Sequence, residues 1–250
     1  MILASTLFLL DITSCEGKAI TMSNKYLIVS FPLKGVYICP NTPGSKVPSH
    51  GTSSFGEKYA IDFVMIRDND KLKKPYKSSV FKYLTSGLQL NDFYGWGQNI
   101  YSPVSGMVVE TENNFEERNP VNILNDYRNT IKVTKDFIDN RSSLKTITGN
   151  YVLIKVDEST FALLAHLKKG SVKVRVGQMV KELEAIGELG HSGNSTMPHL
   201  HMQFMNSDNY KIAEGIPFVF KKYEEKQNNR WITVYNKIPK KEDVIKFCID

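Results

Sequence analysis

Two histidines placed two residues apart are the residues of this chain with the most chemistry to offer. His199 and His201 alternate with Leu200, Met202 and Phe204. Side chains two apart on a strand face the same side, so the alternation predicts a half-buried strand that presents both imidazoles to a groove. Their Cα atoms would lie roughly 6 to 7 Å apart. One imidazole could bind a metal ion while the other reaches a water on that metal, although isolated pairs of this kind also occur on ordinary surface strands.

The cysteines exclude the commonest thiolate metal sites. Cys15, Cys39 and Cys248 are far apart, and no Cys-x-x-Cys pair is present. A metal would therefore be held by histidine and carboxylate side chains. One disulfide is possible if the protein is exported, and an odd count leaves one thiol over.

The charge balance indicates a weakly basic protein. The chain has 32 Lys and Arg against 26 Asp and Glu, a net charge of +6. This balance favours weak attraction to polyanions, including acidic cell-wall polymers. The basic residues are scattered and accompany no nucleic-acid-binding motif, so we expect no nucleic-acid partner. With 250 residues and 41% hydrophobic content, the chain can bury the core of one elaborated domain.

The periodicity predicts a mainly β protein. Strands are expected at residues 26–31, 59–66, 106–110, 130–133, 151–156, 161–166, 199–204 and, last, 231–235. Short helices are expected near residues 80–85 and at 242–248. Residues 67–89 are Lys-rich and residues 113–148 are polar and Asn-rich, so both stretches are expected to decorate loops. Such long connections either shape a substrate site or are simply tolerated.

Four motifs in order along the chain resemble the lysostaphin-type zinc metallopeptidases, which are peptidoglycan endopeptidases. The longest is a glycine turn followed by the histidine strand, at residues 186–201, IGELGHSGNSTMPHLH. The others are YAIDF at 59–63, IYSPVSGMVV at 100–109, and LAHL at 164–167 with VRVGQMV at 174–180. The resemblance runs from about residue 32 to residue 220.

This resemblance implies a two-sheet antiparallel β structure with a substrate groove, and a Zn²⁺ site on the floor of that groove. By motif position, Asp62 and His201 look like zinc ligands, and His166 and His199 like the unligated catalytic imidazoles. Family members usually carry a further histidine four residues before the aspartate. Lys58 stands there and cannot bind zinc.

The missing ligand has one candidate upstream. His50 is the nearest preceding histidine, and the small residues at 53–56 could loop it back to Asp62, an arrangement that resembles a branch of the family. A catalytic zinc takes about three N or O ligands and keeps one position open, and His50, Asp62 and His201 supply that number. Otherwise His50 is a solvent-exposed loop residue.

Two further polar side chains near the motif have modest roles in this interpretation. Gln203 shares the face of the imidazoles and could orient a ligand, although such an amide is more often merely hydrogen-bonded. His191 lies in the glycine turn, where a structural role is expected. No His-Glu-x-x-His motif occurs, which excludes a helical zincin with a glutamate base.

The resemblance implies zinc-dependent hydrolysis of peptide bonds, in peptidoglycan stem or cross-bridge peptides, outside the cytoplasm. The alternative is a catalytically inactive relative that binds the cell wall or a partner, with Lys58 marking a lost metal site. The oligomeric state is left open by the sequence.

Three segments are expected along the chain. Residues 1–23 form an N-terminal segment without the basic start of a secretory signal. Its residues 12–15 resemble a lipobox, so a lipid on Cys15 is the one predicted link to a membrane; a leader remnant and a strand are the alternatives. Residues 24–222 are expected to form the metallopeptidase domain, and residues 223–250 a C-terminal extension that packs on it.

Overall fold

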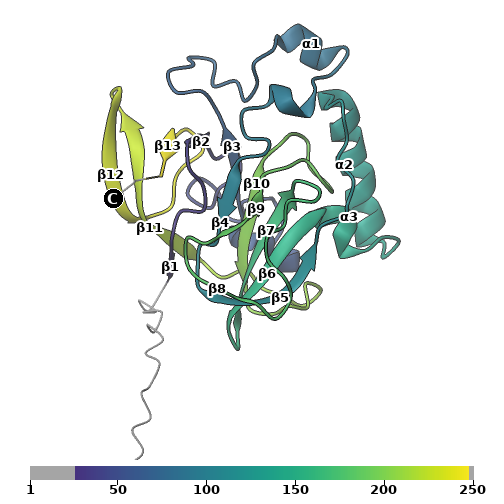
Figure 1. Ribbon diagram of the computed structural model, residues 1–250, viewed down its shortest axis with the longest axis vertical. Helices are drawn as coiled ribbons and strands as arrows, with labels where there is room; N and C mark the ends of the chain where they lie inside the picture. Colours follow the sequence, from purple (N-terminus) through teal and green to yellow (C-terminus); the bar gives the residue numbers. More distant parts are fainter. Residues whose placement is uncertain (1–25, 248–250) are drawn as a thin grey trace, which may run out of the picture.

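The computed structural model describes residues 26–247, and a large β-sheet organises them (Figure 1). Eleven strands join in one sheet, in the order β1-β11-β13-β2-β3-β10-β7-β6-β5-β8 with β12 paired to β11. Strands β4 and β9 form a separate pair. Among the described strands, β1 runs parallel to β11 and the other pairings are antiparallel. The predicted mainly β fold class is confirmed.

The described residues form thirteen strands, and the strands that carry the site lie near the middle of the large sheet. The first seven are β1 (Leu27–Val29), β2 (Val36–Ile38), β3 (Ile61–Met65), β4 (Asn99–Tyr101), β5 (Gly106–Glu112), β6 (Asn150–Asp157) and β7 (Thr160–Leu167). The others are β8 (Met179–Val180), β9 (Ala185–Glu188), β10 (Leu200–Met205), β11 (Phe218–Gln227), β12 (Arg230–Lys237) and β13 (Ile245–Lys246).

The α-helices lie in the two stretches predicted as excursions, and the two 3-10 helices lie before β3 and directly after the first stretch. They are the 3-10 helices η1 (Ser54–Tyr59) and η2 (Leu90–Asp92) and the α-helices α1 (Val80–Leu84), α2 (Ile123–Ile138) and α3 (Leu144–Thr148). The predicted helix near residues 80–85 is confirmed as α1. Helices α2 and α3 lie beside β6 and β7 along one flank of the sheet (Figure 1).

The two faces of β10 lie in different environments. Leu200, Met202 and Phe204 are fully buried in the main core, which they share with residues of β3, β7 and the β4–β9 pair. His201 and Gln203 point to the opposite face and line a pocket. The alternation expected from the sequence is therefore confirmed: burial of the apolar face fixes the register of the strand, and that register turns the imidazole toward the pocket.

Residues 130–133 were expected to form a strand, and this expectation is wrong because they lie inside helix α2. Thr130, Ile131, Lys132 and Val133 alternate in polarity like a half-buried strand, yet Ile131 is 57% exposed. The helix begins after Asn122, whose side chain accepts a hydrogen bond from the Asn125 backbone N–H. This capping bond is the usual start signal of a helix.

The expected helix at residues 242–248 is also wrong for its described part, residues 242–247. Ile245 and Lys246 form β13, which is inserted between β11 and β2. Ile245 is fully buried in the main core, so tertiary burial overrides the local preference. The expected strand at residues 231–235 is confirmed within β12.

The domain division expected from the sequence stays a proposal. Strand β11 continues across its boundary at residues 222 and 223. Cys15, the lipobox-like residues and Cys248 lie outside the described residues. Cys39 is buried and forms no disulfide within residues 26–247. No helix in this described part has the length and apolar character needed to cross a membrane.

Candidate metal and catalytic site

Asp62 is the centre of the candidate site. It lies on β3 directly opposite His201 on β10. Asp62 Oδ1 is 3.0 Å from His201 Nδ1, and Asn41 Nδ2 donates to Asp62 Oδ2 over 2.7 Å. Asp62 is 5% exposed, so its carboxylate is held in a place from which water is largely excluded. Antiparallel pairing thus brings together two residues that are 139 positions apart in the sequence.

His50 reaches the same carboxylate from a loop. Its Nε2 lies 3.0 Å from Asp62 Oδ2. The loop is held by the backbone N–H of Ser49, which donates to the carbonyl oxygen of Lys58 over 3.1 Å. The ammonium of Lys58 lies over the ring of Tyr59, 5.4 Å from its centroid. Lys58 therefore contributes to this region through its backbone, and His50 brings the imidazole.

The second nitrogen of each of these imidazoles is already engaged. Gln203 Nε2 donates to the carbonyl oxygen of Phe55 over 2.8 Å, which turns Gln203 Oε1 toward His201 Nε2 at 3.0 Å. His201 Nε2 must then carry the proton. Ser49 Oγ donates to the carbonyl oxygen of Glu57 over 3.3 Å and can accept from His50 Nδ1 at 3.0 Å. In the neutral rings, His201 Nδ1 and His50 Nε2 thus present lone pairs to Asp62.

Three lone-pair donors that face one another need a cation between them. The ligand atoms of His50, Asp62 and His201 lie within 4.8 Å of one another, a spacing that a metal ion can bridge. Without a metal a proton does this work: burial lowers the pKa of His201, but the hydrogen bond and charge of Asp62 outweigh it and raise the pKa to about 9. Burial opposes ionisation of Asp62, yet the surrounding histidines hold its pKa well below the usual value. The donor set fits a metal that takes N and O ligands.

His166 enters the site through an irregularity in β7. Asn150 pairs with Leu167 and Tyr151 pairs with Ala165, so His166 is an extra residue in the ladder. Its φ of 64° is uncommon for a residue with a side chain. Ala165 and His166 consequently both face the pocket, while Leu167 returns to the main core. Bulges often re-aim a side chain beside an active site in this way.

His166 and His199 present matching nitrogens. His166 Nδ1 donates to the carbonyl oxygen of Ser192 over 2.9 Å, and His199 Nδ1 donates to that of Met197 over 2.8 Å. A carbonyl only accepts, so Nδ1 carries the proton in both rings and Nε2 keeps its lone pair. The ring centroids are 4.7 Å apart, and His199 Nε2 is 3.6 Å from Asp62 Oδ1.

Burial keeps this second pair of imidazoles uncharged. Burial lowers the pKa of His166 well below its ordinary value, and the neighbouring His199 and His201 lower it further. Burial also lowers the pKa of His199, although the charge of Asp62 works against it. A neutral imidazole with a free Nε2 can accept a proton, which is the requirement for a general base.

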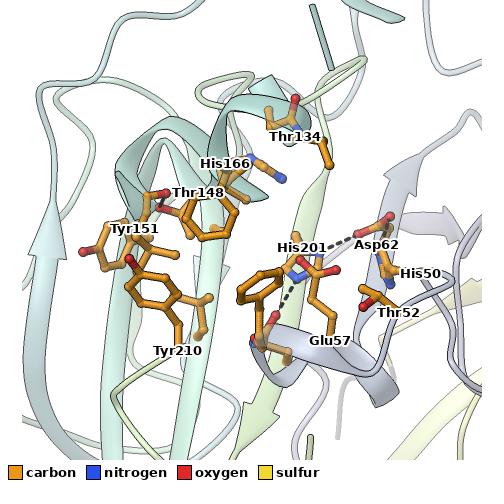
Figure 2. A pocket seen from close by; sticks show the side chains of 18 of the residues that line it. His50, Thr52, Glu57, Asp62, Thr134, Thr148, Tyr151, His166, His201 and Tyr210 are labelled. Atoms are coloured by element: carbon orange, nitrogen blue, oxygen red, sulfur yellow. Dashed lines mark hydrogen bonds and ion pairs between the residues drawn. The ribbon is translucent and has the colours of Figure 1, made fainter. Parts of the chain in front are cut away.

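The five side chains border one pocket of about 450 Å³. Figure 2 shows His50, Asp62 and His201 turned toward one another on one side, with Tyr151 and Tyr210 on the other. The far wall includes Phe137 of α2, whose ring centroid is 5.0 Å from that of Phe55 and 5.5 Å from that of Tyr210. Part of the stretch 113–148, expected to decorate a loop, therefore forms an apolar wall of the pocket.

The structure brings together all five residues that the sequence singled out, and it adds partners that the sequence analysis left unnamed. Asn41 and Ser49 contact the proposed ligands, and the carbonyl groups of Ser192 and Met197 fix two tautomers. Ser49 directly precedes His50 in the sequence, so its role as a partner of that histidine could have been predicted. Asn41 is 21 positions from Asp62 and carries no motif. Backbone carbonyl groups cannot be recognised from residue type.

Comparisons with known proteins match the part of the chain that contains the histidine strand. Residues 132–212 match the model of peptidase family M23. The chain is 37% identical over 70 residues to a peptidoglycan DD-endopeptidase, ShyC, of Vibrio cholerae; the match covers 28% of this chain and 16% of that protein. It is 38% identical over 72 residues to an uncharacterized metalloprotease of Buchnera aphidicola, covering 26% of this chain and 19% of that one. The chain thus spans less than a fifth of either relative.

Among solved structures, the catalytic domain of lysostaphin from Staphylococcus simulans aligns with a TM-score of 0.36 and 19% identity, over 73% of this chain and 88% of that one. The family match includes His166, His199 and His201, and it lies within the region that the motifs delimit. Residues 132–212 are therefore similar to peptidase family M23, in agreement with the resemblance of the motifs to the lysostaphin-type metallopeptidases.

Proposed function

We propose that this protein hydrolyses peptide bonds of peptidoglycan with the help of a bound zinc ion. The observation that carries the proposal is the convergence of three lone-pair donors beside two neutral imidazoles in one pocket. His50 Nε2, Asp62 and His201 Nδ1 would hold the zinc. His166 and His199 would be the catalytic residues.

The bound zinc would polarise the scissile carbonyl and stabilise the negative charge that develops on its oxygen. The protein itself moves the protons. His166 or His199 accepts the proton of the attacking water at Nε2 and passes it to the amide nitrogen that leaves. The hydrogen bonds from Nδ1 to the carbonyls of Ser192 and Met197 hold each ring while its Nε2 gains and loses that proton.

The substrate class rests on the relatives and on the pocket. A protein similar to this chain over 70 residues is named a peptidoglycan DD-endopeptidase, which supports stem or cross-bridge peptides as substrates. The apolar wall at Phe55, Phe137 and Tyr210 can cover alkyl groups of such a peptide. Peptidoglycan lies outside the cytoplasm, so we propose that the protein acts there, and the net charge of +6 suits acidic wall polymers.

The test is digestion of purified peptidoglycan by the full chain, with and without a chelator. New amine termini should appear, stop with the chelator and return with added zinc. His166→Ala and His199→Ala should abolish cleavage while zinc stays bound. Binding to the wall without any chelator-sensitive cleavage would instead support the inactive relative.

A further inference from the structure

A buried polar cluster lies directly behind His199 and has no part in the chemistry described above. It joins Arg118 and Asp126, which belong to the stretch 113–148, to His191 and Ser195 of the glycine turn. Asp126 is 2% exposed, and His191 and Ser195 are fully buried. Charged and polar groups this deep cost free energy unless they are paired, so their arrangement calls for a reason.

Asp126 accepts two hydrogen bonds at one end of the cluster. Arg118 Nε donates to Asp126 Oδ1 over 2.5 Å, and the Asn122 backbone N–H donates to Asp126 Oδ2 over 2.8 Å. Arg118 also donates to the carbonyl oxygens of Gly193 and Ser195, which ties the turn to helix α2. Burial raises the pKa of Asp126, but His191 and Arg118 outweigh it and hold the pKa below the usual value, so the carboxylate is ionised.

A continuous path leads from this carboxylate to His199. Asp126 Oδ1 faces His191 Nε2 at 3.5 Å, and this nitrogen is buried without a hydrogen-bond partner among residues 26–247. His191 Nδ1 is 2.9 Å from Ser195 Oγ, and Ser195 Oγ is 3.1 Å from His199 Nδ1. A carboxylate beside Nε2 favours the proton on that nitrogen, which leaves Nδ1 of His191 as an acceptor.

The single hydroxyl hydrogen of Ser195 couples His191 to His199. It can point to His191 Nδ1 or to the carbonyl oxygen of Met197, which is 2.6 Å away. When His191 Nδ1 accepts it, the Met197 carbonyl is left to the Nδ1–H of His199, and Ser195 Oγ can accept from the same N–H. When His191 Nδ1 carries a proton instead, the hydroxyl turns to Met197 and competes with His199 for that carbonyl.

We propose that Asp126 is a positioning residue for His199, acting through His191 and Ser195, so that the helical stretch around α2 sets the orientation of a catalytic imidazole. The inference rests on the proposed function, because it assigns Asp126 a task in that reaction. A merely structural Asp126 would only anchor helix α2 to the turn.

The test compares three variants of the full chain in its zinc-loaded form. Asp126→Asn keeps the shape of the side chain but removes its charge, and His191→Phe breaks the path. Each should lower kcat on peptidoglycan peptides about 10- to 100-fold with little change in KM or zinc content, because a misdirected base slows the chemical step. The double variant should be no slower than the slower single variant, because both changes cut one path.

Asn122→Ala is the matched control. It removes the cap of the same helix and the bond from Asn122 Nδ2 to the Thr85 carbonyl, but not the backbone N–H that Asp126 accepts. Its Tm should fall while its kcat stays within about twofold of wild type. If Asp126→Asn loses no more kcat than Asn122→Ala, the positioning role is overturned.

A second readout does not need peptidase activity. With ¹⁵N-labelled histidine, His199 should show one tautomer in the wild type, protonated at Nδ1, and altered ring-nitrogen resonances in Asp126→Asn. Unchanged His199 resonances in Asp126→Asn would overturn the inference. If the wild type cleaves no peptidoglycan, the proposed function fails by itself, and the resonances alone decide whether Asp126 orients His199.

Discussion

Replacing Gln203 with leucine is expected to weaken zinc binding without removing any of the three proposed ligands. Gln203 Oε1 accepts the Nε2–H of His201 over 3.0 Å, and this bond leaves His201 Nδ1 free to face Asp62. Leucine offers no acceptor, so the ring loses the contact that fixes its tautomer and its orientation. Outer partners of this kind orient a ligand and raise its basicity.

The magnitude follows from the bonds that are lost. Removing an outer partner of a metal-binding histidine commonly costs about 10- to 100-fold in metal affinity. That range corresponds to about 1.4 to 2.8 kcal/mol of binding free energy. Gln203 is 2% exposed, so His201 Nε2 is also left without a partner in a dry place, which should lower the free energy of unfolding by about 1 to 3 kcal/mol.

Competition with a chromophoric chelator measures the zinc affinity, and thermal unfolding of the metal-free protein measures stability separately. Gln203→Glu is the matched control: it keeps an oxygen for His201 but loses the amide donor to the Phe55 carbonyl, so it should lose less zinc affinity than Gln203→Leu. A folded Gln203→Leu protein that binds zinc as tightly as the wild type would refute the role of this amide in the site.

Three other perturbations test the core, a turn and a buried carboxylate near the site. Met202→Ala, on the fully buried face of β10, should lower the free energy of unfolding by about 2 to 5 kcal/mol in urea denaturation; a loss under 1 kcal/mol would contradict its core position. Gly149→Ala should cost at least about 2 kcal/mol, because φ is +64° and a Cβ would lie 2.4 Å from Ser192 C; wild-type stability would count against this turn geometry. Because the folded pKa of Asp126 is lowered, its stabilisation is present above the unfolded pKa of about 3.9 and is lost as pH falls through the folded pKa. The stability gap between wild type and Asp126→Asn should therefore narrow in denaturation curves below about pH 4, and a gap that stays constant would be evidence against the ionised carboxylate.

The strand that carries His201 could be predicted from the sequence because buried apolar residues alternate there with polar residues that face the pocket. Burial of Leu200, Met202 and Phe204 on one face of the strand is enough to turn His201 and Gln203 to the other face. The same reasoning applies to Asp62 between Ile61 and Phe63 on β3, both of which are fully buried.

The way in which His166 reaches the pocket could not be derived from such a period. Strict alternation along β7 would put Leu163, Ala165 and Leu167 on one face and His166 on the other. The extra residue at His166 breaks the alternation, and it depends on the pairing of β7 with β6. The motif resemblance singled out His166, whereas periodicity would have placed it in the core.

The structure of the stretch at 113–148 could not be predicted from the sequence for a related reason. Its polar composition predicts a loop, and the alternation at residues 130–133 imitates a strand. The helical period becomes visible only with Asp126 and Phe137 as the buried positions of α2. Asp126 is buried by its pairing with Arg118 and His191, and that pairing is a tertiary contact that the local sequence does not record.

The zinc content of two variants tests the proposed site most directly. His50→Ala removes the imidazole whose Nε2 lies 3.0 Å from Asp62, whereas Lys58→Ala removes an ammonium that lies over Tyr59. After reconstitution and removal of free metal, the wild type and Lys58→Ala should each retain about one zinc per chain, in line with one three-ligand site. His50→Ala should retain far less. Full zinc in His50→Ala, or loss of zinc in Lys58→Ala alone, would contradict the assignment of His50, Asp62 and His201 as the metal ligands.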